Sequence, residues 1–187
     1  MTSGDAAIPC RTALILGGAR SGKSRYAQNL AEGFAGELLF IATAEALDPE
    51  MAARIARHRA DRGPRWATRE EPLELVATLE VVAQPGRVVV VDCITLWLSN
   101  LIHAARAPEA EVSLLATAIL SLAGPAILVS NEVGLGVAPA TELGREFRDL
   151  QGRANMALAA ACDVVVTMTA SLPKLVKPAP LPLLILA

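Results

Sequence analysis

Five short runs of aliphatic and β-branched residues, separated by segments with helical patterns, constrain the fold of this 187-residue chain most strongly. The runs are continuous rather than alternating, which is typical of strands that are buried on both faces of a sheet. Parallel strands need long crossover connections, and the intervening helices would supply them. The sequence therefore predicts an α/β fold with a mainly parallel sheet flanked by helices on both faces, and with strands at residues 13–16, 38–43, 88–92, 126–130 and 164–168.

Capping and terminating residues mark the helices between these runs. The best-defined helix is predicted from Asp48 to Arg62, with Pro49 at its first helical position. Segment 178–187 alternates Pro with Leu and Ile, so it cannot form a long helix. No linker or internal repeat is present, and we expect a single domain over residues 1–187. Further helices are predicted at residues 73–82, 96–105, 109–122 and 142–162.

Composition excludes several classes of protein. The net charge of −2 offers no basic field for a nucleic-acid backbone, so we expect no nucleic-acid partner. Hydrophobic residues make up 53% of the chain, but charge, Gly or Pro interrupts every apolar stretch before the roughly 20 residues that a membrane span requires. Residues 1–11 lack the pattern of a secretory signal, which favours a cytoplasmic location. The three cysteines are far apart in the sequence, which predicts free, buried thiols.

The first predicted strand leads directly into Gly17–Ser24, which has the pattern G-x-x-x-x-G-K-S and precedes a helix. In such a loop, glycines allow backbone N–H groups to surround phosphates at a helix N-terminus. Lys23 would reach the β- and γ-phosphate oxygens, and the Ser24 hydroxyl would bind Mg²⁺. The alternative is a glycine-rich turn that matches the pattern by chance. The strand and helix on either side favour a P-loop NTPase-like domain that binds a nucleoside triphosphate.

Two further segments place polar residues at the ends of predicted strands. Asp92 ends the third strand, where a carboxylate either completes the magnesium shell or caps the following helix, a task that Thr95 could share. The phosphate loop favours the metal role. Segment 131–136 follows the fourth strand, at the edge of the sheet where open α/β folds bind ligands. It either helps to form the site of a second substrate or serves as a glycine-rich connection.

His58 lies between two arginines on a predicted helix. One interpretation is a solvated basic face. The other is a phosphate-binding helix in which neighbouring positive charge keeps the imidazole neutral and nucleophilic, so that His58 attacks a phosphate and carries a nucleotidyl group. The residues alone leave both interpretations open. The arginines at turn-like spacing on this helix are Arg54, Arg57, Arg59 and Arg62.

Taken together, these motifs resemble the bifunctional adenosylcobinamide kinase / adenosylcobinamide-phosphate guanylyltransferase family of cobalamin biosynthesis. The resemblance covers residues 12–177. Its motifs are GGARSGKS at 17–24, IAT at 41–43, EMAARIARHRADR at 50–62, VVVVDCITLWLSN at 88–100, NEVGLGVAP at 131–139 and FRDLQGRAN at 147–155.

The resemblance implies two reactions: ATP or GTP phosphorylates adenosylcobinamide, and GTP then donates GMP to the resulting phosphate, giving adenosylcobinamide-GDP. It implies a homotrimer, and it places the guanylylated histidine on His58, so this histidine is interpreted as catalytic together with Lys23. Some relatives have Glu where Asp92 stands. The nucleotide contacts that the resemblance implies are Gly17, Gly18, Ala19, Arg20, Ser21, Gly22, Lys23, Ser24, Ala42, Thr43, Ala44, Arg59, Ala60, Asp61, Arg62, Glu70 and Asp92, with Ser24 and Asp92 on Mg²⁺.

Two other functions compete with this interpretation. A P-loop small-molecule kinase without the nucleotidyl-transfer step would need the phosphate loop and Asp92 but not His58. A nucleotide-gated switch is disfavoured, because the guanine-reading pattern N-K-x-D is absent from the sequence.

Overall fold

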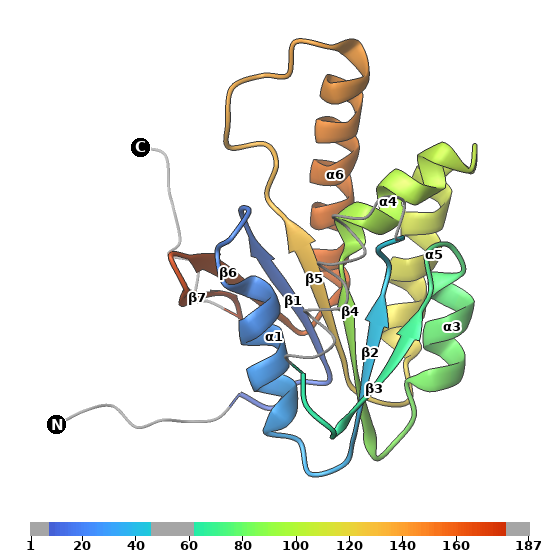
Figure 1. The fold of residues 1–187 in the computed structure, drawn as a ribbon, viewed down its shortest axis with the longest axis vertical. Helices are drawn as coiled ribbons and strands as arrows, with labels where there is room; N and C mark the ends of the chain where they lie inside the picture. The colour runs from blue at the N-terminus through green and yellow to red at the C-terminus, as the bar shows by residue number, and fades with distance from the viewer. Residues whose placement is uncertain (1–7, 46–61, 179–187) are drawn as a thin grey trace, which may run out of the picture.

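The computed structural model describes residues 8–45 and 62–178. Its strands form one seven-stranded sheet with the order β3-β2-β4-β5-β1-β6-β7 (Figure 1). All neighbouring pairs are parallel except β6 and β7. The predicted α/β class is thereby confirmed. The strands are β1 (Thr12–Gly17), β2 (Glu37–Ala42), β3 (Trp66–Glu70), β4 (Arg87–Asp92), β5 (Ala126–Asn131), β6 (Val164–Thr169) and β7 (Leu172–Lys177).

The five predicted strands are confirmed as β1, β2, β4, β5 and β6, and the two edge strands were not predicted. Edge strand β3 ends in Arg69 and Glu70, and β7 is exposed along almost its whole length and contains Pro173. Neither has the continuous aliphatic run of a strand covered on both faces. The described helices are α1 (Lys23–Glu32), α3 (Leu75–Val82), α4 (Ile94–His103), α5 (Pro108–Ser121) and α6 (Glu142–Ala161).

Several predictions fall on residues that the structure does not describe. The predicted helix from Asp48 to Arg62 lies outside the described residues except for Arg62 itself. The same holds for the Pro-rich segment beyond residue 178.

Helix α1 covers one face of the sheet, and α3, α4, α5 and α6 cover the other (Figure 1). On β4, Val88 and Val90 pack with the residues that surround α1, whereas Val89 and Val91 pack with Trp97 of α4. Successive side chains of a strand point to opposite faces, so both sets must be apolar. The same alternation decides which polar residues at the strand ends share the face of α1.

The cysteines are free in the described part of the chain, as predicted. Burial, and secondly the charge of Asp92, raises the pKa of the Cys93 thiol to about 11. Cys162 is also buried, and burial raises its pKa to about 12. The prediction of burial is wrong for Cys10, which is exposed before β1 begins. Across residues 8–45 and 62–178, no helix has the length and apolarity needed to cross a membrane.

Candidate functional site

The phosphate loop, Gly17–Ser24, connects β1 to α1 at the carboxyl edge of the sheet (Figure 1). Its shape depends on glycine at two positions. A Cβ atom on Gly17 would lie 2.5 Å from Ser21 Oγ and 2.9 Å from the Met168 carbonyl oxygen. Gly22 has a φ of +88°, and its Cβ would lie 2.7 Å from Ser171 Oγ. Any side chain at either position would displace the loop.

The loop and the start of α1 carry a cation and hydrogen-bond donors, with no acidic group among them. Lys23 Nζ donates a hydrogen bond to the Gly18 carbonyl oxygen over 3.2 Å, so the ammonium is held over the loop. The first turn of α1 contains no acidic residue, and its N-cap residue, Gly22, has no side chain that could cap the free N–H groups. Ser21 Oγ is buried and has no hydrogen-bond partner within the described part of the chain. A helix N-terminus left open in this way binds anions such as phosphate.

The turn between β6 and β7 supports the phosphate loop from outside. The Ser171 N–H donates to the Ser21 carbonyl oxygen over 2.9 Å. Ala170 and Ser171 have φ values of 50° and 65°, a left-handed conformation that glycine usually provides. This contact could not be predicted from the sequence, because a two-residue turn without Gly, Asn or Asp carries no recognisable signal.

Three of the predicted nucleotide contacts form one row across the sheet. Ala42 of β2 is paired with Glu70 of β3 on one side and with Asp92 of β4 on the other. Phe40 and Ala42 pack on the face of α1, and so do Val88 and Val90. Strand alternation therefore places Glu70, Ala42 and Asp92 on that same face, the one where the phosphate loop enters α1.

Thr43 and Ala44 follow this row along the chain. The Thr43 side chain hydrogen-bonds the backbone at the end of β4. Its hydroxyl donates to the Cys93 carbonyl oxygen over 2.7 Å and accepts from the Cys93 N–H over 2.8 Å. Asn100 Nδ2 donates to the Thr43 carbonyl oxygen over 2.8 Å. The fully buried Thr43 side chain therefore joins β2 to the start of α4, and Ala44 is the first partly exposed residue after it.

Arg62, predicted as a nucleotide contact, is buried in the structure: it is only 6% exposed. Its guanidinium carbon lies 3.8 Å from the centroid of the Phe40 ring, and Nη2 donates to Thr68 Oγ1 over 3.3 Å. The stacking is a cation–π contact that holds Arg62 against β2. The other predicted residues of that helix, His58, Arg59, Ala60 and Asp61, lie outside the described residues.

The donor chemistry of Ser24 and Asp92 fits Mg²⁺. A hydroxyl and a carboxylate are the hard oxygen ligands that this ion takes, together with waters and substrate phosphates. Cys93, rather than Asp92, occupies the N-cap position of α4, and Thr95 Oγ1 accepts from the Asn131 N–H instead of capping. Within the described part of the chain, no group of three or more His, Cys, Asp or Glu could hold a metal. A magnesium ion here would therefore depend on the phosphates that accompany it.

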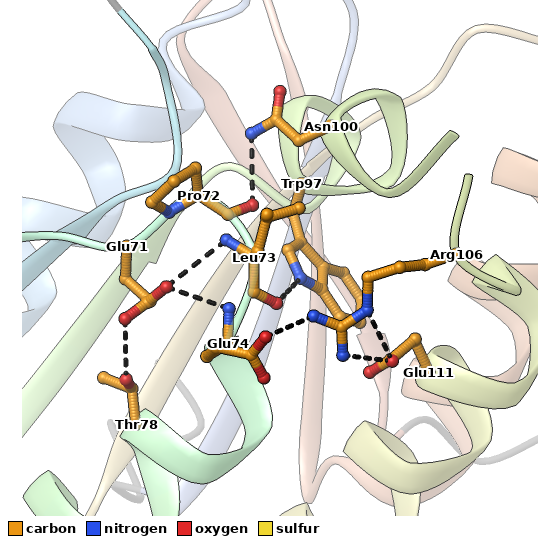
Figure 2. Close-up of polar contacts among 9 residues, drawn as sticks. All are labelled: Glu71, Pro72, Leu73, Glu74, Thr78, Trp97, Asn100, Arg106 and Glu111. Carbon is orange, nitrogen blue, oxygen red and sulfur yellow. Dashed lines mark hydrogen bonds and ion pairs between the residues drawn. The ribbon is translucent and has the colours of Figure 1, made fainter. Parts of the chain in front are cut away.

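A second polar cluster, the Glu71–Arg106 cluster, holds the connection after β3 in place (Figure 2). Glu71 accepts hydrogen bonds from the N–H groups of Leu73 and Glu74 and from the Thr78 hydroxyl. Burial alone would raise the pKa of Glu71, but these hydrogen bonds and Arg69 outweigh it and lower the pKa. Arg106 pairs with Glu74 and with Glu111. The members of this cluster are Glu71, Pro72, Leu73, Glu74, Thr78, Trp97, Asn100, Arg106 and Glu111.

Helix α4 closes the Glu71–Arg106 cluster from the other side. Trp97 is fully buried, and its Nε1 donates to the Leu73 carbonyl oxygen over 2.9 Å. Asn100 Nδ2 donates to the Pro72 carbonyl oxygen over 3.2 Å and to the Thr43 carbonyl oxygen over 2.8 Å. The cluster therefore fixes the backbone directly after Glu70 and at Thr43, so it supports the row of residues on the α1 face.

Comparison with known proteins identifies relatives along almost the whole chain. Bifunctional adenosylcobalamin biosynthesis protein CobP of Pseudomonas aeruginosa is 48% identical over 170 residues, which cover 90% of this chain and 98% of that protein. Bifunctional adenosylcobalamin biosynthesis protein CobU of Escherichia coli K12 is 39% identical over 167 residues, which cover 81% of this chain and 92% of that protein.

Among solved structures, the assembled ATPase EscN of the enteropathogenic E. coli type III secretion system matches with a TM-score of 0.57. The match has 15% identity and covers 86% of this chain and 43% of EscN, so it supports the P-loop NTPase fold alone. Residues 13–176 match the family described as cobinamide kinase / cobinamide phosphate guanyltransferase. Because this match spans the sheet, the phosphate loop and the Asp92 row, the chain belongs to that family of P-loop enzymes.

Proposed function

We propose that this chain phosphorylates the aminopropanol hydroxyl of adenosylcobinamide with ATP or GTP, and then transfers GMP from GTP to the phosphate it has made. The observation that carries the proposal is the phosphate loop, with Lys23 held over it and the row through Asp92 on the same face of the sheet. Membership of the kinase and guanyltransferase family supports both reactions.

In the first reaction, residues 17–24 hold the triphosphate. The N–H groups at the start of α1 and the Lys23 ammonium neutralise negative charge on the β- and γ-phosphates. Ser24 and Asp92 hold Mg²⁺, which stabilises charge on the phosphate oxygens when it is bound. The substrate hydroxyl oxygen bonds to the γ-phosphorus and its proton is released to solvent, while the bond from the γ-phosphorus to the β-phosphate oxygen breaks and the nucleoside diphosphate leaves.

In the second reaction, His58 is the nucleophile. Its imidazole nitrogen bonds to the α-phosphorus of GTP, and the bond to the β-phosphate oxygen breaks, so pyrophosphate leaves. A phosphate oxygen of adenosylcobinamide phosphate then attacks the same phosphorus and releases His58. In this proposal Arg59, Ala60, Asp61, Ala42 to Ala44 and Glu70 surround the nucleotide, whereas Arg62 is buried against Phe40 and contributes from behind the carboxyl edge of the sheet. The arrangement of Ala42, Glu70 and Asp92 in one row is compatible with that role.

The proposal includes the assembly and the setting of the reaction. We assign the chain one nucleotide-binding domain, a homotrimeric assembly and a cytoplasmic location. The resemblance to the family supports the trimer.

A labelling experiment tests the nucleotidyl-transfer step. The purified protein is incubated with magnesium and GTP labelled at either the α- or the γ-phosphate, then denatured and treated with acid. A phosphoramidate is acid-labile, so we expect retained α-label that acid removes and that is absent from the His58→Ala variant. His103→Ala is the matched control, because His103 is an exposed residue at the end of α4 and hydrogen-bonds Ser99 of its own helix.

Each other outcome has a definite meaning. If no α-label is retained while adenosylcobinamide is still phosphorylated, the chain is a P-loop kinase without the transfer step. If His58→Ala retains the label and His103→Ala loses it, the nucleophile is assigned wrongly.

A further inference from the structure

A buried polar network lies between β5 and α6, behind the carboxyl edge of the sheet. Ser130 and Gln151 are fully buried, and Asn155 is 7% exposed. Asn155 Oδ1 accepts from Ser130 Oγ over 2.7 Å and from Gln151 Nε2 over 3.0 Å, and Gln151 Nε2 also donates to Ser130 Oγ. Burying polar groups costs free energy unless they are paired, so a network of this kind needs a structural reason.

The reason is the position of Asn131. Asn155 Nδ2 donates to the Asn131 carbonyl oxygen over 3.0 Å. Thr95 Oγ1, from the first turn of α4, accepts from the Asn131 N–H over 3.0 Å. The next residue, Glu132, donates its N–H to the Gly17 carbonyl oxygen at the start of the phosphate loop over 3.2 Å. Side chains from two helices therefore fix both backbone groups of a single residue.

The topology places Asn131 between the two halves of the nucleotide site. Strand β5 lies between β4, which ends in Asp92, and β1, which ends at Gly17. In the register of the sheet, Asn131 is paired with Gly17 itself. Ligands of open parallel sheets bind at this edge. A triphosphate that extends from the phosphate loop toward Asp92 therefore passes the end of β5.

The side chain of Asn131 lies on the face of the nucleotide site. Ile127 and Val129 pack on the α1 face, whereas Ser130 bonds α6 on the opposite face. Alternation therefore directs Asn131 to the α1 face, with Asp92. Its backbone is fixed on both sides, but within residues 8–45 and 62–178 its half-buried side-chain amide forms no hydrogen bond.

We propose that Asn131 is a further catalytic residue of the kinase step, and that its side-chain amide donates a hydrogen bond to the γ-phosphate of the triphosphate held by the phosphate loop. The inference rests on the proposed function and adds a contact to it. In phosphoryl transfer, charge is spread over the oxygens of the transferred group, and a preorganised donor between the phosphate loop and the metal stabilises that charge. Thr95 and Asn155 are then positioning residues, because they act through the Asn131 backbone.

The test compares the affinities of a triphosphate and a diphosphate. Isothermal titration with a non-hydrolysable GTP analogue and with GDP, both with magnesium, is carried out on wild type, Asn131→Ala and Asn131→Asp. For Asn131→Ala we expect a loss of about 10-fold for the triphosphate, the size of one hydrogen bond to a charged group, and less than about twofold for GDP. Asn131→Asp places a carboxylate against the γ-phosphate, so its loss for the triphosphate is larger. Asn29→Ala, on the exposed face of α1, is the control.

A second pair of variants tests whether Thr95 positions Asn131 through the Asn131 N–H. Thr95→Val keeps the shape but removes the acceptor for the Asn131 N–H, and Thr95→Ser keeps the acceptor. We expect Thr95→Val to lose selectivity for the triphosphate in the same direction as Asn131→Ala, and Thr95→Ser to restore it.

Equal losses for both nucleotides, or no loss for either, would overturn the proposal, since a purely structural role affects the two alike. Failure of wild type to bind either nucleotide would instead refute the proposed function. Thermal unfolding of each variant shows whether the fold is intact.

Discussion

The phosphate loop and the Glu71–Arg106 cluster are both polar, but they use their polar groups in opposite ways. In the cluster, side chains bond one another and the neighbouring backbone: Glu71 accepts three hydrogen bonds, and Arg106 pairs with two carboxylates. In the phosphate loop, backbone and glycine make the shape, and the buried Ser21 hydroxyl has no partner among the described residues. Substitutions in the cluster should therefore reduce stability, and those in the loop should reduce nucleotide binding.

The largest effect is expected from Lys23→Met. The variant removes the ammonium held over the loop, so kinase turnover should fall about 100- to 1,000-fold, the size of losing one strong donor to transferring charge. The free energy of unfolding should change by less than about 1 kcal/mol. Lys174→Met, in the exposed strand β7, is the control. A large loss of stability in Lys23→Met would show that the loop serves the fold.

Comparing Gly22→Ala with Gly86→Ala separates the effect of backbone strain on stability from the effect of a distorted phosphate loop on binding. Gly22 and Gly86 have similar φ values of +88° and +84°, but a Cβ on Gly22 would lie 2.7 Å from Ser171 Oγ, whereas nothing lies within 4 Å of one on Gly86. Both alanine variants should lose about 1 kcal/mol of stability from the left-handed conformation. Only Gly22→Ala should also lose triphosphate affinity, by about 10-fold or more in titration calorimetry. Equal triphosphate affinities of Gly22→Ala and Gly86→Ala would contradict the account.

In the Glu71–Arg106 cluster, Trp97→Phe should reduce stability and spare binding. The indole N–H bonds the Leu73 carbonyl oxygen in a fully buried site, so losing it leaves an unpaired acceptor and a cavity. Urea unfolding should show a loss of about 2 kcal/mol. Trp66→Phe should lose less, because the Trp66 N–H donates to Glu32 at an exposed position. A drop in nucleotide affinity in folded Trp97→Phe would break the comparison.

The smallest expected effect is on the pH dependence of the free energy of unfolding, through Glu71. The folded-state pKa of Glu71 lies below its usual value of 4.5, so the folded state favours the ionised form. That stabilisation is present above pH 4.5 and is lost as the pH falls through the folded-state pKa. Glu71→Gln should make unfolding less dependent on pH in this range, by roughly 0.5 kcal/mol after solvent screening. If urea midpoints of Glu71→Gln and wild type fall in parallel with pH, the prediction is wrong.

The central strands and the phosphate loop could be predicted because their signals are local. A strand covered on both faces is aliphatic at every position, and the loop needs Gly17, Gly22 and Lys23 at fixed spacing. Edge strands β3 and β7 lack such a signal, because solvent on their open side permits Arg69, Glu70 and Pro173.

The supports of the site could not be predicted, because their partners are far apart in the sequence. Thr43 bonds Cys93, 50 residues away, and Gln151 bonds Ser130 across 21 residues. Each residue taken singly has the polarity of a surface residue. Thr43 illustrates the limit: the sequence predicts a nucleotide contact there, and the structure shows its hydroxyl bonded to the backbone of Cys93.

The measurement that tests the central claim most directly is the mass of the product formed from adenosylcobinamide, GTP and magnesium. Wild type should convert the substrate first to its phosphate and then to adenosylcobinamide-GDP. Lys23→Met should leave the substrate almost unconverted, and His58→Ala should stop at the phosphate. Unchanged substrate with folded wild-type protein, or adenosylcobinamide-GDP at wild-type rates with both variants, would contradict the account.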